Sequence, residues 1–236
     1  MKHLVWLPLV LGAACAKTPS DDLLTHGIYA DLAAQATGDG TTLVTATLYV
    51  GDPVDLNFVE LQGDDQLIAT HDTDTEVMTQ VELGNIVGHQ ASFQTDMEGD
   101  DFHIDFKRTV DAGAPDSVAT LPAPFTIDTP PTSASRAQDL TLTWTSADDD
   151  TPMMWSATGE CITGTNGTVN AGSNALTISA NTFVQAGPGS GSGAAESCTV
   201  SFAIQRQLQG TLDPGYGQGG TIFGTQARAI QFTSNP

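Results

Sequence analysis

The sequence predicts an all-β protein made of two antiparallel β-sandwich domains. Apolar residues recur at every second position rather than with the 3.6-residue period of a helix. Thr, Ala, Gly, Ser and Asp are abundant and only 6% of the residues are aromatic, which favours short strands joined by many turns. With 236 residues, 39% of them hydrophobic, the chain has enough apolar material for two small cores.

The first domain is expected over residues 25–114. The clearest alternation lies in Thr42–Val50, and the preceding strand Ile28–Ala36 ends at Gly38-Asp39-Gly40, whose Asp-Gly step supplies the positive φ of a hairpin turn. Polar turns separate the remaining expected strands, and this number of short strands is typical of a sandwich. These strands are Asn57–Leu61, Gln66–His71, Glu76–Leu83, Ala91–Asp96 and Phe102–Lys107.

The second domain is expected over residues 115–236. Five prolines between Val110 and Pro131 place the boundary near residue 115, because such a segment interrupts regular strands. The alternating pattern then starts again. The expected strands are Phe125–Ile127, Asp139–Thr145, Met153–Thr158, Ala175–Ser179, Cys198–Gln205 and Ile230–Thr233.

The first fourteen residues have the order of an export signal peptide. A short basic start precedes the apolar run Leu4–Leu11, which has about half of the roughly 20 residues that a bilayer span needs. Gly12-Ala13-Ala14-Cys15 then resembles the lipobox of bacterial lipoproteins. The family usually has Leu three residues before the cysteine, where this chain has Gly12. The alternative is ordinary cleavage after Ala14 or Ala16, which would release a soluble protein.

The lipobox resemblance implies cleavage before Cys15, diacylglycerol on its sulfur and attachment to a membrane through that lipid. Ala16 after the cysteine resembles an outer-membrane address, so we expect a lipid-anchored protein of the cell envelope. The lipidated tether is expected over residues 15–24, because Ala16–Asp22 is small and polar and contains Pro19, a composition that predicts flexibility.

The cysteine count fits this interpretation. The chain has three cysteines, and lipidation of Cys15 leaves Cys161 and Cys198 to form a disulfide in the oxidising compartment that an exported chain meets. Closing that loop stabilises a domain by roughly 3 to 4 kcal/mol on the chain-entropy model.

The charge limits the partners. Seven basic residues stand against 28 acidic ones, and a net charge of -21 repels the phosphates of nucleic acid and of anionic lipid headgroups. We therefore expect no nucleic-acid partner. The sequence does not distinguish a protein from a carbohydrate partner.

Two acidic clusters are candidate calcium sites. Asp72, Asp74 and Glu76 occupy alternate positions, so their side chains would point the same way in an extended segment. Such closely spaced oxygen ligands suit Ca²⁺. Asp148, Asp149 and Asp150 follow a predicted strand as a turn. Among 28 acidic residues such clusters arise easily, so solvated loops are the favoured interpretation. No cofactor is expected to be required.

Motifs for catalysis are missing from the sequence: it has no Gly-x-Ser-x-Gly elbow, no His-Glu-x-x-His and no phosphate-binding glycine loop before a lysine. A hydrolytic group could be assembled from His71, His103 and either Asp72 or Asp105, but no serine is selected to join them. We therefore expect that the protein is not an enzyme.

Three aromatic residues of the second half are candidates for ligand contact. Trp144 shares a face with Leu140 and Leu142, which favours burial in the core. Trp155 follows two methionines, and exposure there would allow it to stack on a sugar. Tyr216 lies in the glycine-rich stretch Gly210–Gly220, which is expected to be a crossover between sheets rather than a recognition loop.

Several segments carry a family resemblance. Thr120–Ile127, Asp139–Trp144 and Gly210–Gly217, together with the Ala-Ala-Cys signal, resemble acidic surface lipoproteins of myxobacterial type. Phe125–Ile127 and Leu140–Trp144 also resemble the opening strands of immunoglobulin-like sandwich domains of bacterial surface proteins. The resemblance implies two immunoglobulin-like domains on a lipid anchor and no known activity.

We therefore expect an envelope lipoprotein of structural or ligand-binding type. The first alternative is a calcium-assisted carbohydrate-binding or adhesion module. The second is a hydrolase that its sequence motifs do not reveal.

Overall fold

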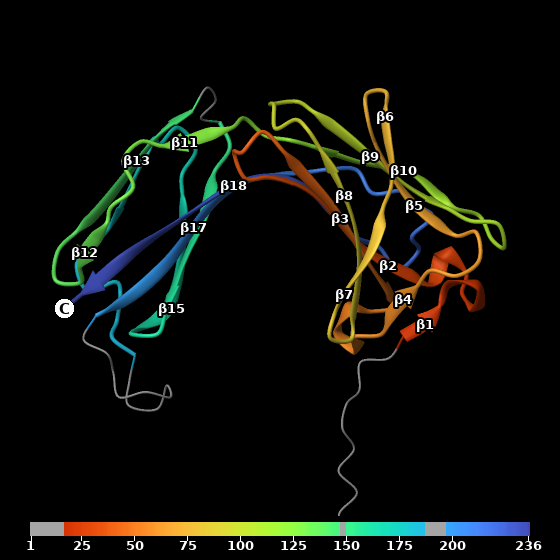
Figure 1. Cartoon of the computed structure of the whole chain (residues 1–236), viewed down its shortest axis with the longest axis horizontal. Helices are drawn as coiled ribbons and strands as arrows, with labels where there is room; N and C mark the ends of the chain where they lie inside the picture. Colours follow the sequence, from red (N-terminus) through yellow and green to blue (C-terminus); the bar gives the residue numbers. More distant parts are fainter. Residues whose placement is uncertain (1–16, 147–149, 187–196) are drawn as a thin grey trace, which may run out of the picture.

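The computed structural model describes residues 17–146, 150–186 and 197–236. Strands β1 to β18 and three 3₁₀ helices make up its regular structure, without an α-helix in these residues, and the predicted all-β sandwich class is confirmed. The same residues contain no helix that is long and apolar enough to cross a membrane. Two lobes are joined into an arch (Figure 1).

The first lobe is a sandwich around one hydrophobic core. The sheet β10-β9-β5-β6 packs against strands β4, β3, β2, β8 and β7 of a larger sheet, and Leu48, Phe93, Phe102 and Phe106 fill the space between them. The strands are β1 (Lys17–Pro19), β2 (Ile28–Ala36), β3 (Thr42–Val50), β4 (Phe58–Glu60), β5 (Gln66–His71), β6 (Asp74–Val77), β7 (Thr79–Leu83), β8 (Ile86–Phe93), β9 (Asp101–Lys107) and β10 (Ala114–Thr120), with 3₁₀ helices η1 (Ser20–Asp22), η2 (Thr25–Gly27) and η3 (Pro53–Asp55).

The second lobe has its own core. The sheet β11-β13-β16 packs against β18, β17, β14 and β15 over Trp144, Trp155, Phe202 and Phe232. The strands are β11 (Phe125–Ile127), β12 (Ser133–Ser135), β13 (Leu140–Ser146), β14 (Met153–Gly159), β15 (Ile162–Val169), β16 (Ala175–Ile178), β17 (Cys198–Gln209) and β18 (Gly220–Asn235).

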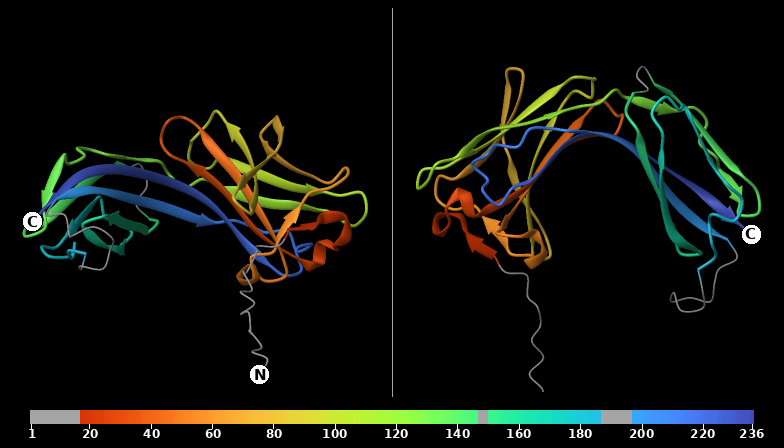
Figure 2. Two further views of the ribbon diagram at one scale, coloured as in Figure 1. Left: turned by 60° about the horizontal axis from the view of Figure 1, so that its bottom comes forward. Right: turned by 180° about the vertical axis from the view of Figure 1, so that it is seen from behind.

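One sheet runs through both lobes in the order β1-β4-β3-β2-β18-β17-β14-β15. The 16-residue strand β18 pairs with β17 in the second lobe and enters the first lobe, where Gly220–Gln226 pairs with β2. This sheet forms the concave side of the arch, and the two smaller sheets cover the convex side (Figures 1 and 2). Most strand pairs are antiparallel, as a sandwich of this class requires, and the pairs β1–β4, β12–β18 and β18–β2 are parallel.

The lobes do not divide the chain at residue 115. Strand β10 pairs with β9, and the first core continues through Leu121 and also takes in Tyr216 and Ile222. Prolines 122 and 124 follow, and there the chain crosses to the second lobe. At the crossing, a Cβ on Gly224 would overlap the carbonyl group of Thr120, so glycine allows the connection to lie against β18.

The expected flexible tether over residues 15–24 is built into the body from Lys17 onward. Strand β1 pairs in parallel with β4, and Ser20 in η1 is fully buried. Side-chain partners hold this segment more strongly than its small, polar composition suggested. Cys15 and the rest of the signal lie outside the described residues.

Several strand predictions need correction. The expected strand Glu76–Leu83 is divided into β6, which pairs with β5, and β7, which pairs with β8, because buried Met78 turns the chain from one sheet to the other. The strand expected at Ala91–Asp96 is β8, which begins at Ile86. Strand β15 was not expected, since its sequence is polar and contains two glycines.

Candidate functional site

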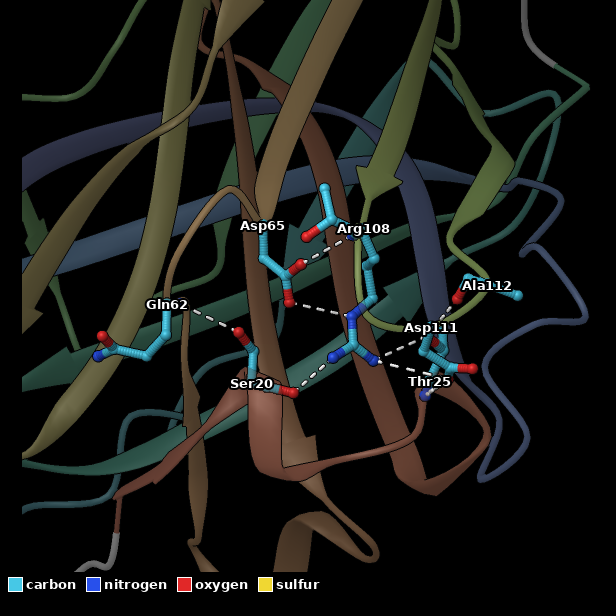
Figure 3. A network of polar contacts seen from close by, with 8 residues as sticks. Ser20, Thr25, Gln62, Asp65, Arg108, Asp111 and Ala112 are labelled. Carbon is cyan, nitrogen blue, oxygen red and sulfur yellow. Dashed lines mark hydrogen bonds and ion pairs between the residues drawn. The ribbon is translucent and has the colours of Figure 1, made fainter.

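A buried polar network joins the N-terminal segment to the first lobe (Figure 3). The Arg108 guanidinium, at the end of β9, donates from Nε to Asp65 Oδ2 at 3.0 Å, from Nη1 to Thr25 Oγ1 at 3.0 Å, and from Nη2 to the Ser20 carbonyl. Ser20 Oγ in turn accepts from the Gln62 N–H at 3.0 Å. We call these contacts the N-terminal clamp.

The clamp balances its charge internally. The Arg108 and Asp65 side chains are 0% and 2% exposed, so each would carry a large desolvation cost without the other. Asp111 Oδ2 lies 3.7 Å from Arg108 Nη1 and accepts from the Thr25 N–H at 2.7 Å. Backbone hydrogen bonds, first that from Thr25, and the nearby guanidinium lower the pKa of Asp111. The clamp therefore fixes η1 and η2 at neutral pH.

In the second lobe, β14, β15 and β17 line a groove of about 320 Å³ on the face of the large sheet that points away from the core. Its walls come from alternate residues that point away from the core on neighbouring strands, so regular strand pairing alone brings them together. Met154 supplies the apolar floor, and hydroxyl and amide groups surround it. The lining side chains used below are Met154, Ser156, Asn166, Thr168 and Gln205.

A second groove, of about 250 Å³, is lined by β3, β7 and β8 on the same sheet in the first lobe. It lies where Gly88 of β8 leaves room between β3 and β7, and Val81, Leu83 and Ile86 make it mainly apolar. Both grooves lie on the face of the large sheet that points away from the two cores.

Below the second groove, His89 is a buried titratable group. Its side chain points toward the first core, is 2% exposed, and has no hydrogen-bond partner for either ring nitrogen among the protein atoms. Burial lowers its pKa to about 4, because a charged imidazole would lose its hydration there. His89 is therefore neutral at physiological pH.

The predicted cluster of Asp72, Asp74 and Glu76 does not form. Asp72 occupies the turn between β5 and β6 with a φ of 51°, so it does not continue the alternation of Asp74 and Glu76 in exposed strand β6. In the described ranges no three His, Cys, Asp or Glu side chains gather as a metal ion requires. In the second cluster, Asp148 and Asp149 lie outside the described residues, and Asp150 is the first residue after that gap.

The residues proposed for hydrolysis are not brought together. His71 stacks on the core residue Phe102 with ring centroids 5.0 Å apart, whereas His103 lies on the opposite, exposed face of β9 with Asp105. Asp72 lies 3.7 Å from His71 in an exposed turn. Burial raises the pKa of Asp105. The charge of Lys107 lowers this pKa, whereas the charges of Asp116 and Asp213 raise it further. These positions form no nucleophile–base pair.

The aromatic candidates are core residues. Trp144 is buried as expected. Trp155 is buried as well and stacks on Phe202 at 5.7 Å, while Met154 takes the exposed position, so the sugar-stacking hypothesis for Trp155 is wrong. Tyr216 stacks on Phe106, and burial raises its pKa well above the usual range. The glycine-rich segment is therefore a packed crossover.

The predicted disulfide is confirmed. Cys161, in the β14–β15 turn, is bonded to Cys198 at the start of β17, with Cα atoms 5.6 Å apart. It fastens the start of β17 to the β14–β15 turn.

Sequence reasoning missed the clamp, the grooves and His89. The structure buries three of the seven basic residues, namely Arg108, Arg136 and Arg206. Their partners come from distant segments, so spacing could not identify them.

Neither a protein-family model nor a curated protein matches the chain. A crystal structure of the N-terminal four immunoglobulin domains of Dscam1 isoform 9.44, with zinc, is similar at a TM-score of 0.19 and 6% sequence identity. The alignment covers 87% of this chain and 66% of the Dscam1 chain, so this chain spans just under two thirds of the length of the Dscam1 chain. A TM-score this low carries no argument about function.

Proposed function

We propose that this chain is an acidic lipoprotein of the cell envelope, attached through lipid on Cys15, with the outer membrane as its location. Its β arch serves as a structural or ligand-binding scaffold without catalysis. The lipobox-like sequence before Cys15 motivates the attachment. The absence of a nucleophile–base pair among the histidines and carboxylates singled out above is consistent with a binding role.

The observation that carries this proposal is the N-terminal clamp. A protein held by its N-terminus transmits any pull on the anchor to the first described residues. In this chain those residues are paired with β4 and bonded to Arg108, and Lys17 Nζ also lies 2.8 Å from Glu82 Oε2. An anchored function explains why a buried arginine holds an otherwise polar N-terminal segment.

The anchor is tested by comparing the wild-type protein with the variant Cys15→Ser after membrane fractionation. We expect mass spectrometry to find an acylated Cys15 at the mature N-terminus, and we expect the variant to leave the membrane fraction. The variant Cys161→Ser is the matched control, because it removes a cysteine without removing the anchor. A mature protein whose N-terminus follows Ala14 or Ala16 and carries no acyl group would contradict the proposal.

The groove on the second lobe supports carbohydrate binding as a more specific role. Hydroxyl and amide groups of Ser156, Asn166, Thr168 and Gln205 surround the thioether of Met154, and the groove lining contains no charged side chain. Such a surface offers hydrogen bonds to sugar hydroxyls and an apolar contact for a ring face. The ligand favoured by this chemistry is a neutral sugar.

This role is tested with an array of neutral oligosaccharides probed with the wild-type protein. The variant Gln205→Ala should weaken binding roughly tenfold, the usual effect of losing one buried hydrogen bond. Gln231→Ala, at an exposed position of β18, is the matched control and should bind normally. If no oligosaccharide binds, or if Gln205→Ala binds as the wild type does, the carbohydrate role is excluded.

A further inference from the structure

One end of the first lobe exposes several large apolar side chains. Val54 and Leu56 lie in the connection between β3 and β4, and Leu83 and Ile86 flank the β7–β8 turn. Val54 and Leu83 are 81% and 80% exposed, and the other two are also exposed. We call these four residues the apolar tip.

Strand directions bring the apolar tip to the point where the described chain begins. Strand β8 runs antiparallel to β3, so Ile86 lies at the end where β3 finishes, and β1 starts at this end because it runs parallel to β4. Lys17 pairs with Phe58, two residues after Leu56, and its ion pair with Glu82 places it beside Leu83. β1, β4 and the β7–β8 turn lie together at the lower end of the lobe in Figure 1.

The apolar tip is held in shape. Asp52 Oδ1 accepts from the Val54 N–H at 2.8 Å, and the Val50 N–H donates to the Asn57 carbonyl at 2.9 Å, which closes the connection. The β7–β8 turn is a hairpin with continuous pairing from Thr79 to Leu83. The apolar side chains are therefore presented to solvent by ordered backbone.

The sequence leaves very little chain between this end and the proposed lipid. Cys15 precedes Lys17 by two residues, and two residues span at most about 7 Å. The polar headgroup layer of a bilayer is itself roughly 5 to 7 Å thick on each side. A chain acylated at Cys15 thus brings its first strand to the depth of the headgroups.

We propose that the apolar tip rests in the interfacial layer of a membrane of low anionic lipid content. This rests on the proposed lipid anchor. The exposed apolar side chains supply the contact, since Asp52, Asp55 and Glu82 lie at the same end and Lys17 is already paired with Glu82. The same carboxylates, in a chain of net charge -21, oppose an anionic surface.

This docking gives the arch a fixed orientation. The clamp ties the N-terminal segment rigidly to the first lobe, so the lobe does not rotate freely about the anchor. The groove lined by Val81 and Gly88 lies on the face that carries Ile86 and Leu83, and it is therefore held next to the membrane. The second lobe extends away from this end of the first lobe (Figure 2).

The test places a new tryptophan at Leu83→Trp, with Val184→Trp as the matched control, because Val184 is a similarly exposed apolar residue of the second lobe. Each protein is attached to phosphatidylcholine vesicles that contain brominated lipid. Attachment uses the protein's own acyl groups or, for an unacylated chain, coupling of the Cys15 thiol to a maleimide lipid. The wild-type protein supplies the background emission of Trp144 and Trp155.

We expect the tryptophan at position 83 to be blue-shifted and to lose roughly half of its emission to the bromines, and the one at position 184 to remain nearly unquenched. Adding Val54→Ser and Ile86→Ser to Leu83→Trp should reduce the quenching. Replacing half of the phosphatidylcholine by phosphatidylglycerol should reduce it as well.

Vesicle-bound protein with no quenching at position 83, or with equal quenching at 83 and 184, would overturn the docking proposal. Because maleimide coupling does not depend on natural acylation, this result is separate from the test of the anchor. If mass spectrometry finds no acyl group on the native mature protein, yet the maleimide-coupled protein shows quenching at position 83, the proposed anchor is refuted and the apolar tip is supported.

Discussion

Acidification should destabilise the first lobe through His89. The pKa of this residue is about 4 in the folded protein and about 6.5 in an unfolded chain. Above pH 6.5 neither state binds the proton, and the stability is fully present. As the pH falls from 6.5 toward 4, only the unfolded state becomes protonated, so the free energy of unfolding decreases.

The size of the effect follows from the two pKa values. Their difference corresponds to about 3 kcal/mol in total, at about 1.4 kcal/mol for each pH unit. Between pH 7.5 and pH 5.0 the expected loss is about 2 kcal/mol, because the folded state is still mostly unprotonated at pH 5.0.

The assay is urea unfolding at both pH values, followed by hydrogen exchange in peptides from β3 and β8. These peptides report on the first lobe, whereas Trp144 and Trp155 lie in the second. His89→Met removes the titrating group at similar volume, and His103→Met, on the exposed face of β9, is the matched control. The many carboxylates contribute equally to all three proteins and cancel in the comparison. If His89→Met loses as much stability as the wild type between pH 7.5 and 5.0, the argument from burial is refuted.

Three further predictions concern the clamp, the disulfide and the lobe crossing. Arg108→Met should cost about 3 to 5 kcal/mol in urea unfolding, since it leaves the buried Asp65 carboxylate unpaired, and adding Asp65→Asn should recover part of that loss; full stability of the single variant would contradict the clamp. Replacing Cys161 and Cys198 by Ser should lower second-lobe stability by roughly 3 to 4 kcal/mol, measured by tryptophan fluorescence, with the first lobe unchanged. Gly224→Ala should cost about 1 to 3 kcal/mol in thermal unfolding through overpacking, and a neutral result would mean that the crossing relaxes easily.

Several elements follow from local sequence alone. The strict alternation and Asp-Gly turn of the first hairpin predicted β2 and β3 with the bounds that the structure shows, and the bounds of β5 agree as well. The pairing of Cys161 with Cys198 followed from counting cysteines in an exported chain. Period-two patterning, turn chemistry and covalent possibilities are properties of short segments, so a single sequence carries them.

Other features depend on which distant segments meet. Short glycine-containing segments hid the length of β18, which joins two cores that the prolines near residue 115 suggested were separate. Burial of Trp155 rather than Met154 was decided by which face of β14 meets the core. The local pattern does not show which of the two side chains faces the core, because Met154 and Trp155 are adjacent and both apolar.

The sequence by itself determined the all-β class, the short hairpins, the disulfide pair and the grounds for expecting a lipid anchor at Cys15. Only the tertiary structure decided that the segment after that cysteine is part of the body. Arg108, Asp65 and Ser20 lie 43 to 88 positions apart in their contacts, and folding alone brings them to hydrogen-bonding distance. A buried charge requires a partner but does not specify where in the chain that partner lies, which is why composition suggested a tether where packing produces a clamp.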